Sequence, residues 1–569
     1  MRGIDTLWLT SNKIKGFNMN GSRNSKRGFK ISILLTGIVA LGACLRIIAM
    51  IFFTGAIDTE GAVYARIAEN LFLGKGYVSI ATPGLELTFP PGFPFLIAIL
   101  SFFARDYELA ARLVCIIFGS ILPIGVYYVT SKLYDRKTSL LAAAAAALHP
   151  LLINASASTY SEISYITAVI IGTYFAIRCM EGAKIHWFVS TGAVFGLGYL
   201  IRPEGFILPF MTGLFIAIVQ WKSGRTAWRG IAAMLVTFFI MAGPYIAFLY
   251  HHTGQLRFEG KTPINFELGR RVLAGEDFYE ISFGVGPNLE GTGVWMRSNE
   301  AVIRSARISF KDKARIALRG SKELAFLTNK LSKGSLGSFL LLFLAILGLF
   351  NKPWPRGKIK VQLFLIGLVC SSAAGLLTII HSESSRFYWI YVPLLLIWAS
   401  NGAIYLRDWT ISTIDAGRKC TSIGKIAGIA VGVLPLVGIF TISLVAVYVY
   451  NKAAIEQSRP NKVAGVWLRN FQSGRITIMD SQTNLAFHCG GDFVFIPNGA
   501  AETVLAYADR KKVDFIVLRP FHPWIKGRKV IEDWGLNGIK DERAELVYAS
   551  PGRITEGSIF IYRWKHRDS

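Results

Sequence analysis

The sequence predicts a polytopic α-helical membrane protein with a C-terminal soluble α/β domain. Hydrophobic residues make up 52% of its 569 residues, and the mean hydropathy is +0.42. Several apolar runs reach the ~20 residues that a helix needs to cross a bilayer. The chain has 62 Lys and Arg against 36 Asp and Glu, and the excess lies in short clusters between apolar runs, as in cytoplasmic loops. The lipid bilayer therefore accounts for the basic charge, and nucleic acid is not implied as a partner.

The N-terminal part predicts a cytoplasmic leader followed by a membrane anchor. Residues 1–30 are polar and basic, and we expect them to be disordered; Met19 is a second candidate start of the chain. The first apolar run is too long for a signal peptide and lacks a small-residue cleavage site, so it should remain uncleaved. Arg23, Arg27 and Lys30 precede it, which places the N-terminus in the cytoplasm and Asp58 outside.

A transmembrane domain is predicted over residues 31–450, with external loops at 56–108 and 253–335. The segment 92–104 is too short to cross and is interpreted as a re-entrant or juxtamembrane helix. Basic residues within 308–331 follow a helical pattern, which fits either a helix on anionic headgroups or a solvated one. Counting spans by length and basic flanks gives about 11 transmembrane helices, near residues 31–55, 109–133, 139–153, 163–177, 187–201, 206–221, 231–250, 337–350, 361–380, 387–406 and 426–450.

The tail, residues 451–569, has a soluble composition and is predicted to lie on the periplasmic or exterior side. Five segments, RITIMD, FVFIP, VDFIVLRP, ELVYAS and SIFIYRW, are typical of strands, and helical patterns such as ETVLAYADRKK separate them. The tail contains neither a G-x-G-x-x-G turn nor a P-loop, so nothing indicates nucleotide binding.

The first external loop contains the first carboxylates after a long apolar run. Asp58 and Glu60 precede apolar residues at helical spacing, which predicts a short amphipathic helix lying on the membrane surface. A structural interpretation is that Asp58 caps this helix and Glu60 favours its positive end. The alternative interpretation is that both carboxylates belong to a functional site.

Charged residues recur at the predicted outer ends of the helices. Ionisable groups at this depth are costly and tend to line a cavity, although each could also be an interfacial charge that reaches water. A carboxylate can serve as a general base, while Arg or Lys can stabilise a departing phosphate. These residues are Asp58, Glu60, Glu162, Arg202, Glu204, Lys261, Glu383 and Arg386.

No cofactor is required by this chemistry. A monophosphate leaving group can be stabilised by Arg and Lys alone. A divalent metal is compatible with the chemistry, but no cluster in the sequence supports one. The six cysteines include no close pair such as C-x-x-C.

Four segments carry a resemblance to a known family. They are DTEGAVYARIAENLFLGKGY with the following FPPGFP, then YSEISY, LIRPEG and SRFYWIYVPLLL, and they span most of the chain to about Ser400. In this order they resemble the GT-C fold membrane glycosyltransferases, in the branch of the protein O-mannosyltransferases and the lipid A aminoarabinose transferases.

The resemblance implies an inverting glycosyltransferase that takes a sugar from a polyprenyl-phosphate carrier at the outer face of the cytoplasmic membrane. The acceptor would be a glycolipid, a polysaccharide or a protein. A first-loop acid would be the base. Members often have adjacent Asp-Glu four and three residues before a tyrosine, whereas this chain has D-T-E before Tyr64. Residue type favours Asp58 as the base, and register favours Glu60.

The remaining candidates are assigned to the substrate. The resemblance implies that three cations, Arg202, Lys261 and Arg386, bind the lipid phosphate. Tyr64, Glu162, Glu204 and Glu383 are further candidate substrate-binding residues.

Two other functions fit part of the pattern. A transporter or flippase of lipid-linked sugars would need broken spans and polar residues near the bilayer midplane. Here the polar residues lie toward one surface, which favours an enzyme. An oligosaccharide-transferring enzyme would share the outer site, but the tail has no WWDYG-like motif.

Overall fold

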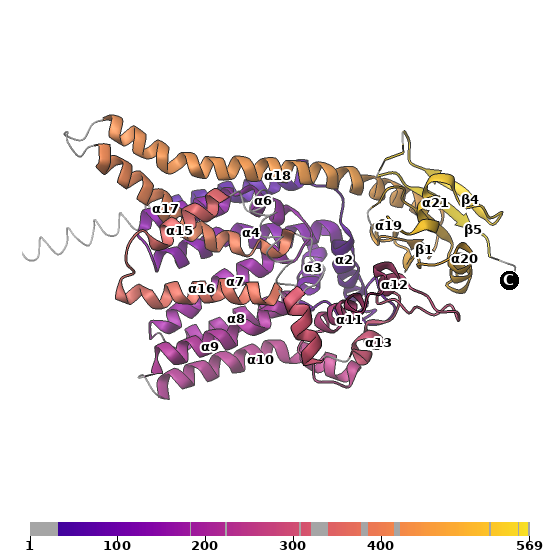
Figure 1. Cartoon of the computed structure of the whole chain (residues 1–569), viewed down its shortest axis with the longest axis horizontal. Helices are drawn as coiled ribbons and strands as arrows, with labels where there is room; N and C mark the ends of the chain where they lie inside the picture. Colours follow the sequence, from indigo (N-terminus) through magenta and orange to yellow (C-terminus); the bar gives the residue numbers. More distant parts are fainter. Residues whose placement is uncertain are drawn as a thin grey trace, which may run out of the picture.

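The protein consists of a long helical bundle with a small mixed domain at one end. The computed structural model describes residues 32–182, 184–221, 225–306, 309–319, 339–376, 385–414, 422–522, 525–552, 554–555 and 557–566. Figure 1 shows the bundle with its helices nearly side by side, and the sheet of the C-terminal domain beyond their ends.

The bundle is built from helices of unequal length. In chain order they are Ser32–Phe52, α2 (Thr59–Phe72), α3 (Gly92–Ala104), α4 (Tyr107–Ser131), α5 (Arg136–Leu148), α6 (Pro150–Ala157), α7 (Glu162–Met180), α8 (Ile185–Ile201), η1 (Pro203–Phe206), α9 (Ile207–Val219), α10 (Arg225–Thr253), α15 (Phe339–Phe350), α16 (Arg356–Leu376), η3 (Ser385–Tyr388), α17 (Tyr391–Ile414) and α18 (Ser422–Phe471). The loop after α10 adds α11 (Lys261–Leu273), α12 (Phe278–Phe283) and α13 (Asn299–Ser305).

The chain is a multi-pass membrane protein. In the described part of the chain, the predicted spans lie on helices, one of them on the pair α5 and α6. By length and composition five helices could cross a membrane, or up to six if α5 and α6 count as one bent span. The total of 11 crossings therefore stays a prediction. The segment 92–104 forms the short apolar helix α3.

One predicted span differs in shape from the expectation. The segment 139–153 is not a single straight helix, because α5 ends at Leu148 and α6 begins at Pro150, with a bend of 50° between them. Proline has no N–H to donate and its ring collides with the preceding turn, so it favours the first position of a new helix. After the bend, α6 ends at Ala157 and leads directly into the loop that contains Tyr160.

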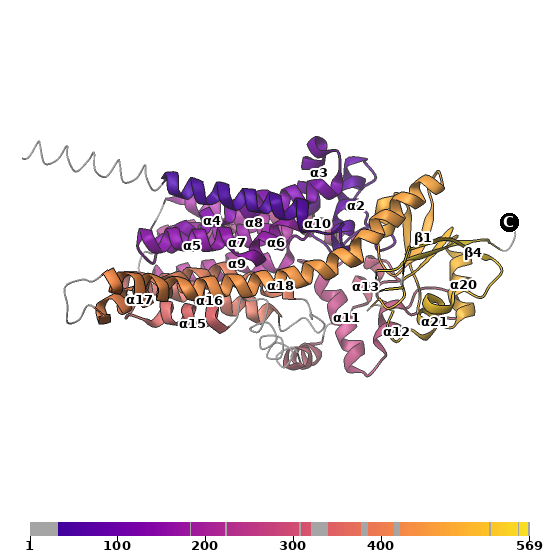
Figure 2. The ribbon, with the colours of Figure 1, turned by 90° about the horizontal axis from the view of Figure 1, so that it is seen from above.

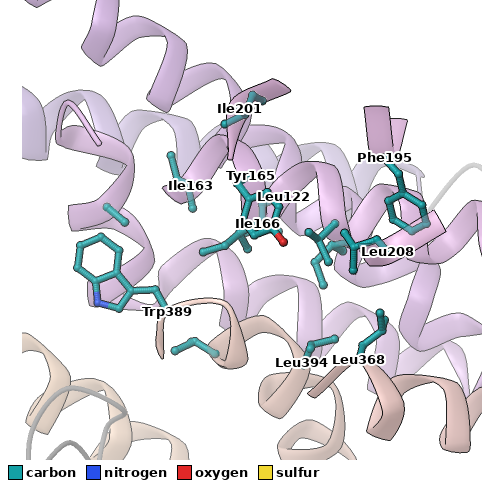
Figure 3. Close-up of a cluster of buried hydrophobic side chains, with 14 of the residues drawn as sticks. Leu122, Ile163, Tyr165, Ile166, Phe195, Ile201, Leu208, Leu368, Trp389 and Leu394 are labelled. Carbon is teal, nitrogen blue, oxygen red and sulfur yellow. The ribbon is translucent and has the colours of Figure 1, made fainter. Parts of the chain in front are cut away.

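The core of the bundle is apolar and continuous. Figure 3 shows part of it, where Ile166 on α7, Phe195 on α8 and Leu394 on α17 lie among other buried side chains. Helices α15 and α17 approach especially closely at two glycines. A Cβ on Gly348 would lie 1.8 Å from the Trp398 carbonyl oxygen, and one on Gly402 would lie 2.2 Å from that of Leu344. Small residues permit such close helix packing in membranes.

Helix α18 joins the bundle to the C-terminal domain. It has 50 residues and continues past Tyr450, where the last predicted span ends, to Phe471. Figures 1 and 2 both show it running along the bundle and on into the small domain. The tail thus begins as a continuous extension of a bundle helix.

The C-terminal domain contains a five-stranded mixed sheet of order β2-β1-β3-β5-β4. Strand β1 pairs in parallel with β2 and β3, and β5 pairs antiparallel with β3 and β4. Each strand lies on one of the five predicted segments, which confirms them. The elements are β1 (Thr477–Asp480), α19 (Asn484–Cys489), β2 (Asp492–Phe495), α20 (Ala501–Arg510), β3 (Phe515–Leu518), α21 (Lys529–Asn537), β4 (Ala544–Ala549) and β5 (Phe560–Trp564).

The close contact between α15 and α17 gives a test of the packing. Gly348→Ala should lower the midpoint of thermal unfolding of the purified protein in detergent, because overpacking of this kind costs about 1–3 kcal/mol. Gly367→Ala on α16 is the control, since a Cβ there meets no atom within 4 Å. Alanine is the better helix former by about 1 kcal/mol, so the control should be unchanged or more stable. Equal shifts in both variants would contradict the packing.

Candidate active site

The first carboxylates lie at the start of α2. Asp58 is the N-cap residue, and its side chain accepts a hydrogen bond of 2.6 Å from the backbone N–H of Gly61. A Cβ on Gly61 would lie 2.1 Å from Thr159 Oγ1, so the first turn of α2 packs directly on the loop after α6. The capping role is therefore real, and it coexists with a position at the meeting point of several segments.

Helix α2 packs between the bundle and the C-terminal domain, and its position on the membrane surface stays a prediction. Tyr64 and Ala68 belong to the core of the bundle, whereas Val63 and Ile67 pack with Leu468 of α18 and residues of the sheet. The helix is buried on two sides because the bundle covers one face and α18 with the C-terminal domain covers another.

A network of ion pairs connects Glu60 with three other segments. Arg386 Nη2 lies 2.5 Å from Glu60 Oε2, and Arg386 Nη1 lies 3.6 Å from Glu162 Oε1. Arg202 Nη1 is 2.9 Å from Glu162 Oε1, and Arg202 Nη2 is 3.2 Å from Glu204 Oε1. The network joins α2, the start of α7, the end of α8, η1 and η3.

Tyr64 and Lys261 complete this cluster. The Tyr64 hydroxyl donates to Glu60 Oε1 at 3.0 Å, as expected for side chains four residues apart on a helix. Lys261, at the start of α11, lies over the ring of Phe89 at 5.5 Å and acts electrostatically on Glu60 and Glu204. Three carboxylates, Glu60, Glu162 and Glu204, are thereby balanced by three cations, Arg202, Lys261 and Arg386.

The two first-loop carboxylates have opposite electrostatic environments. Burial raises the pKa of Asp58 to about 6, and the N–H of Gly61 and the charge of Arg386 only partly oppose this shift. Burial also acts to raise the pKa of Glu60, but the charges of Arg386, Lys261 and Arg202 outweigh it and lower that pKa to about 2. Glu60 is thus a fixed anion within the cationic cluster, whereas Asp58 can exchange a proton near neutral pH.

Asp58 lies in the wall of a cavity of about 200 Å³. Tyr160 also lines it; its hydroxyl interacts with the Asp58 carboxylate, and its ring lies 4.3 Å from the guanidinium of Arg386. Tyr160 therefore separates the cavity from the ion pairs. The other lining residues are Thr54, Gly55, Ala56, Thr59, Arg112, Asn154, Ser158, Thr159, Tyr450, Asn451, Ala454, Gln457, Ser458, Asn461, Gln482 and Asn484.

Arg112 on α4 holds the segment before Asp58 in place. Its Nη1 donates to Thr54 Oγ1 at 2.8 Å and to the Ala157 carbonyl at 2.9 Å. Its Nη2 donates to the Gly55 carbonyl at 2.7 Å and to Glu108 Oε1 at 2.9 Å. This buried side chain fixes the end of the first helix against α4 and α6.

Eight of the nine candidates from the sequence converge around α2. Asp58 faces the cavity, and Glu60, Tyr64, Glu162, Arg202, Glu204, Lys261 and Arg386 form the ion-pair cluster. Glu383 lies outside the described residues. Within the described ranges there is no group of three or more His, Cys, Asp and Glu that could hold a metal ion.

Other residues of the site were missed by the sequence analysis. Arg112, a cation inside an apolar run, and Tyr160, two residues before Glu162, carried signals that could have identified them. Tyr450, Asn461 and Gln482 carried none, because they approach Asp58 only through the extension of α18 and the C-terminal domain.

Comparisons with known proteins agree with this architecture. Residues 88–248 match the family model described as dolichyl-phosphate-mannose-protein mannosyltransferase. No curated protein sequence matches the chain.

Two solved structures resemble the whole arrangement. The archaeal oligosaccharyltransferase AglB from Archaeoglobus fulgidus, in complex with an inhibitory peptide and a dolichol-phosphate, is 13% identical, with a TM-score of 0.58 over 87% of this chain and 70% of AglB. ArnT from Cupriavidus metallidurans, bound to undecaprenyl phosphate, is 13% identical, with a TM-score of 0.51 over 93% of this chain and 97% of ArnT. At this identity the likeness concerns the fold. The chain has the GT-C fold of membrane glycosyltransferases, which confirms the resemblance seen in the sequence.

The contacts of Arg112 can be tested through stability. Arg112→Ala should destabilise the protein by about 3–5 kcal/mol, because it removes one member of a buried ion pair and leaves carbonyl groups without a donor. Thermal unfolding in detergent measures this effect. Lys132→Ala is the matched control, since its pair with Glu181 is more exposed and such surface pairs contribute about 0–1 kcal/mol. Similar losses in both variants would contradict the anchoring role.

Proposed function

We propose that the protein is an inverting glycosyltransferase. It transfers a sugar from a polyprenyl-phosphate carrier to a hydroxyl group of a glycolipid, polysaccharide or protein at the outer face of the cytoplasmic membrane. One observation carries this proposal: two carboxylates at the start of the same helix have different surroundings. Asp58 faces a cavity and has a raised pKa, whereas Glu60 lies in a cationic cluster and has a lowered pKa.

Asp58 is the general base of the proposed reaction. A base works best when its pKa lies near the working pH, and a value of about 6 meets this condition. Its carboxylate accepts the proton of the acceptor hydroxyl while the acceptor oxygen attacks the anomeric carbon. The bond between that carbon and the phosphate oxygen breaks with its electron pair, and the lipid phosphate leaves. A single displacement of this kind inverts the anomeric configuration.

The cationic cluster stabilises the departing phosphate. Arg202, Lys261 and Arg386 come from three different segments and surround Glu60, so positive charge is concentrated beside the base, and Arg386 reaches the cavity lining at Tyr160. Guanidinium groups suit phosphate oxygens because they donate in pairs. The matching family model, which describes dolichyl-phosphate-mannose transferases, supports a polyprenyl-phosphate donor.

The placement of the cluster supports an enzyme over a transporter. Glu162 begins α7, Arg202 caps the end of α8 and Asp58 caps the start of α2, so the charges lie at helix ends on one side of the bundle. Positive residues flank the other ends, which supports a cytoplasmic N-terminus and an exterior C-terminal domain.

Replacement of each carboxylate by its amide tests the roles of the base and of the fixed anion. Asp58→Asn should lower kcat for transfer by about 10²–10⁴-fold, the contribution of a positioned base, while asparagine still caps α2. Glu60→Gln should change donor binding more than kcat. The assay measures release of lipid phosphate from undecaprenyl-phosphate-linked sugars in reconstituted membranes.

Asp106→Asn is the matched control for helix capping, because Asp106 caps α4 in the same way and lies outside the cavity. Its kcat should equal that of the unmodified protein. Full activity of Asp58→Asn would exclude Asp58 as the base.

The pH dependence gives a second test of the base. Protonation removes the base, so kcat/KM should fall as the pH decreases through about 6. The negative charge of Glu60 raises the pKa of Asp58, so Glu60→Gln should move this acid limb to lower pH. A pH–rate profile of both proteins measures the shift. If the acid limb of the unmodified protein lies near the ordinary pKa of an aspartate, the assignment of Asp58 as the base is contradicted.

A further inference from the structure

We propose that the cavity beside Asp58 binds a neutral saccharide unit of the acceptor, and that the C-terminal domain forms part of this binding site. The inference rests on the proposed function and names the chemical class of its acceptor. It is carried by the lining of the cavity, by its size, and by the segments that supply its walls.

The lining is rich in carboxamides and hydroxyls. Each Asn or Gln has two donors and an oxygen that accepts, a combination that matches the mixed donor and acceptor character of sugar hydroxyl groups. Some of these groups serve hydrogen bonds within the wall, as between Asn461 and the Gln457 carbonyl, and others can serve a ligand. The aromatic side chains Tyr160 and Tyr450 add apolar faces with polar tips. Six carboxamides line the cavity: Asn154, Asn451, Gln457, Asn461, Gln482 and Asn484.

The charges of the cavity argue against an anionic ligand. Arg112 is the cation of the lining, and its donors already serve Glu108, Thr54 and two carbonyl groups. Asp58 would repel a phosphate or carboxylate once it is ionised. The cations suited to phosphate lie in the other cluster, beyond Tyr160.

The size of the cavity fits one sugar ring. Its volume of about 200 Å³ is below the ~300–1,000 Å³ of pockets that enclose drug-sized ligands. An extended peptide or a long glycan would therefore place only one unit inside. The hydroxyl of that unit would lie next to Asp58, with the cationic cluster on the far side of Tyr160.

The C-terminal domain and α18 form one wall of the cavity. Tyr450, Asn451, Gln457 and Asn461 lie on α18, and Gln482 and Asn484 follow β1. Direct hydrogen bonds bind the wall to the rest of the site. Asn484 Nδ2 donates to the Ile57 carbonyl, and Asn451 Nδ2 donates to Asn154 Oδ1 at 2.8 Å.

A buried ion pair fixes the orientation of this wall. Arg519 forms two hydrogen bonds with the Asp480 carboxylate and also donates to Asn461 on α18. Both charged side chains are at most 4% exposed. Asp480 also accepts from the backbone N–H groups of Ser481 and Gln482, so the turn that carries Gln482 is held relative to α18. The domain is thus a structural part of the site.

Filling the cavity tests whether it binds the acceptor. Ala454 lines the cavity from α18, whereas the adjacent Ala453 is exposed and outside the lining. Ala454→Phe should occupy the space of the ligand, and Ala453→Phe adds the same group on the solvent side as a matched control. Gln482→Leu removes one carboxamide with little change in volume.

Binding is measured first, with the full chain in nanodiscs. The probes are methyl glucoside, methyl galactoside, methyl mannoside, glucose 6-phosphate and a Ser/Thr-containing peptide. Saturation-transfer difference NMR measures the binding of each probe. We expect a signal from at least one neutral glycoside with the unmodified protein and with Ala453→Phe. The signal should weaken at least tenfold with Ala454→Phe and fall with Gln482→Leu. Absence of glycoside binding, equal binding to Ala454→Phe, or stronger binding of the phosphate or the peptide would overturn the inference.

A second measurement separates this inference from the proposed function. Release of lipid phosphate from undecaprenyl-phosphate mannose and undecaprenyl-phosphate glucose, with water as the only acceptor, should be the same for Ala453→Phe and the unmodified protein, and it should fall in Asp58→Asn. If the unmodified protein cleaves the donor, but Ala454→Phe binds the glycosides as well as the unmodified protein does, the saccharide site alone is rejected. Glycoside binding without any dependence of donor cleavage on Asp58 would reject the proposed base and leave the saccharide site standing.

Discussion

The end of the bundle next to the C-terminal domain depends on the ion pairs that join Glu60, Arg386, Glu162 and Arg202. These residues come from segments up to 326 positions apart in the sequence. Each guanidinium contacts two carboxylates, and that of Arg386 also lies over the ring of Tyr160. A buried charge is costly unless it is paired, so any one of these side chains requires the others in place. The network therefore fixes α2, α7, α8 and η3 relative to one another.

The same network explains why Asp58 differs from its neighbour. The three cations are matched by Glu60, Glu162 and Glu204, so Asp58 experiences Arg386 only as a secondary influence. Its burial dominates and raises its pKa, as expected when desolvation outweighs nearby charge. Pairing of the other carboxylates thus leaves one carboxylate, Asp58, with a pKa near neutral pH, which is the property that a general base needs.

Sequence reasoning identified what local patterns determine. The five strands of the tail alternate or run apolar over short segments, and Asp58 follows an apolar run directly, so both were recognisable. The partner of α2 was not predictable, because amphipathic spacing shows that Val63 and Ile67 are covered but not which residues cover them. Sheet and α18 residues cover them. The carboxamides of the cavity were not predictable, since Asn154, Asn451 and Gln482 meet only through the fold and none belongs to a motif.

The spacing of the D-T-E segment decides which acid faces which partner. Asp58 is the N-cap, so its side chain turns back to the N–H of Gly61, whereas Glu60 is already within the first helical turn and points toward Tyr64. Residues two apart on a helix do not share a face. The position relative to Tyr64 and the residue type gave opposite assignments of the base because each criterion corresponds to a different face of the helix. The register with Tyr64 follows the cationic face, and the aspartate at the cap follows the cavity. In the proposed reaction the base must contact the acceptor hydroxyl, so the carboxylate that faces the cavity, Asp58, is the one assigned that role.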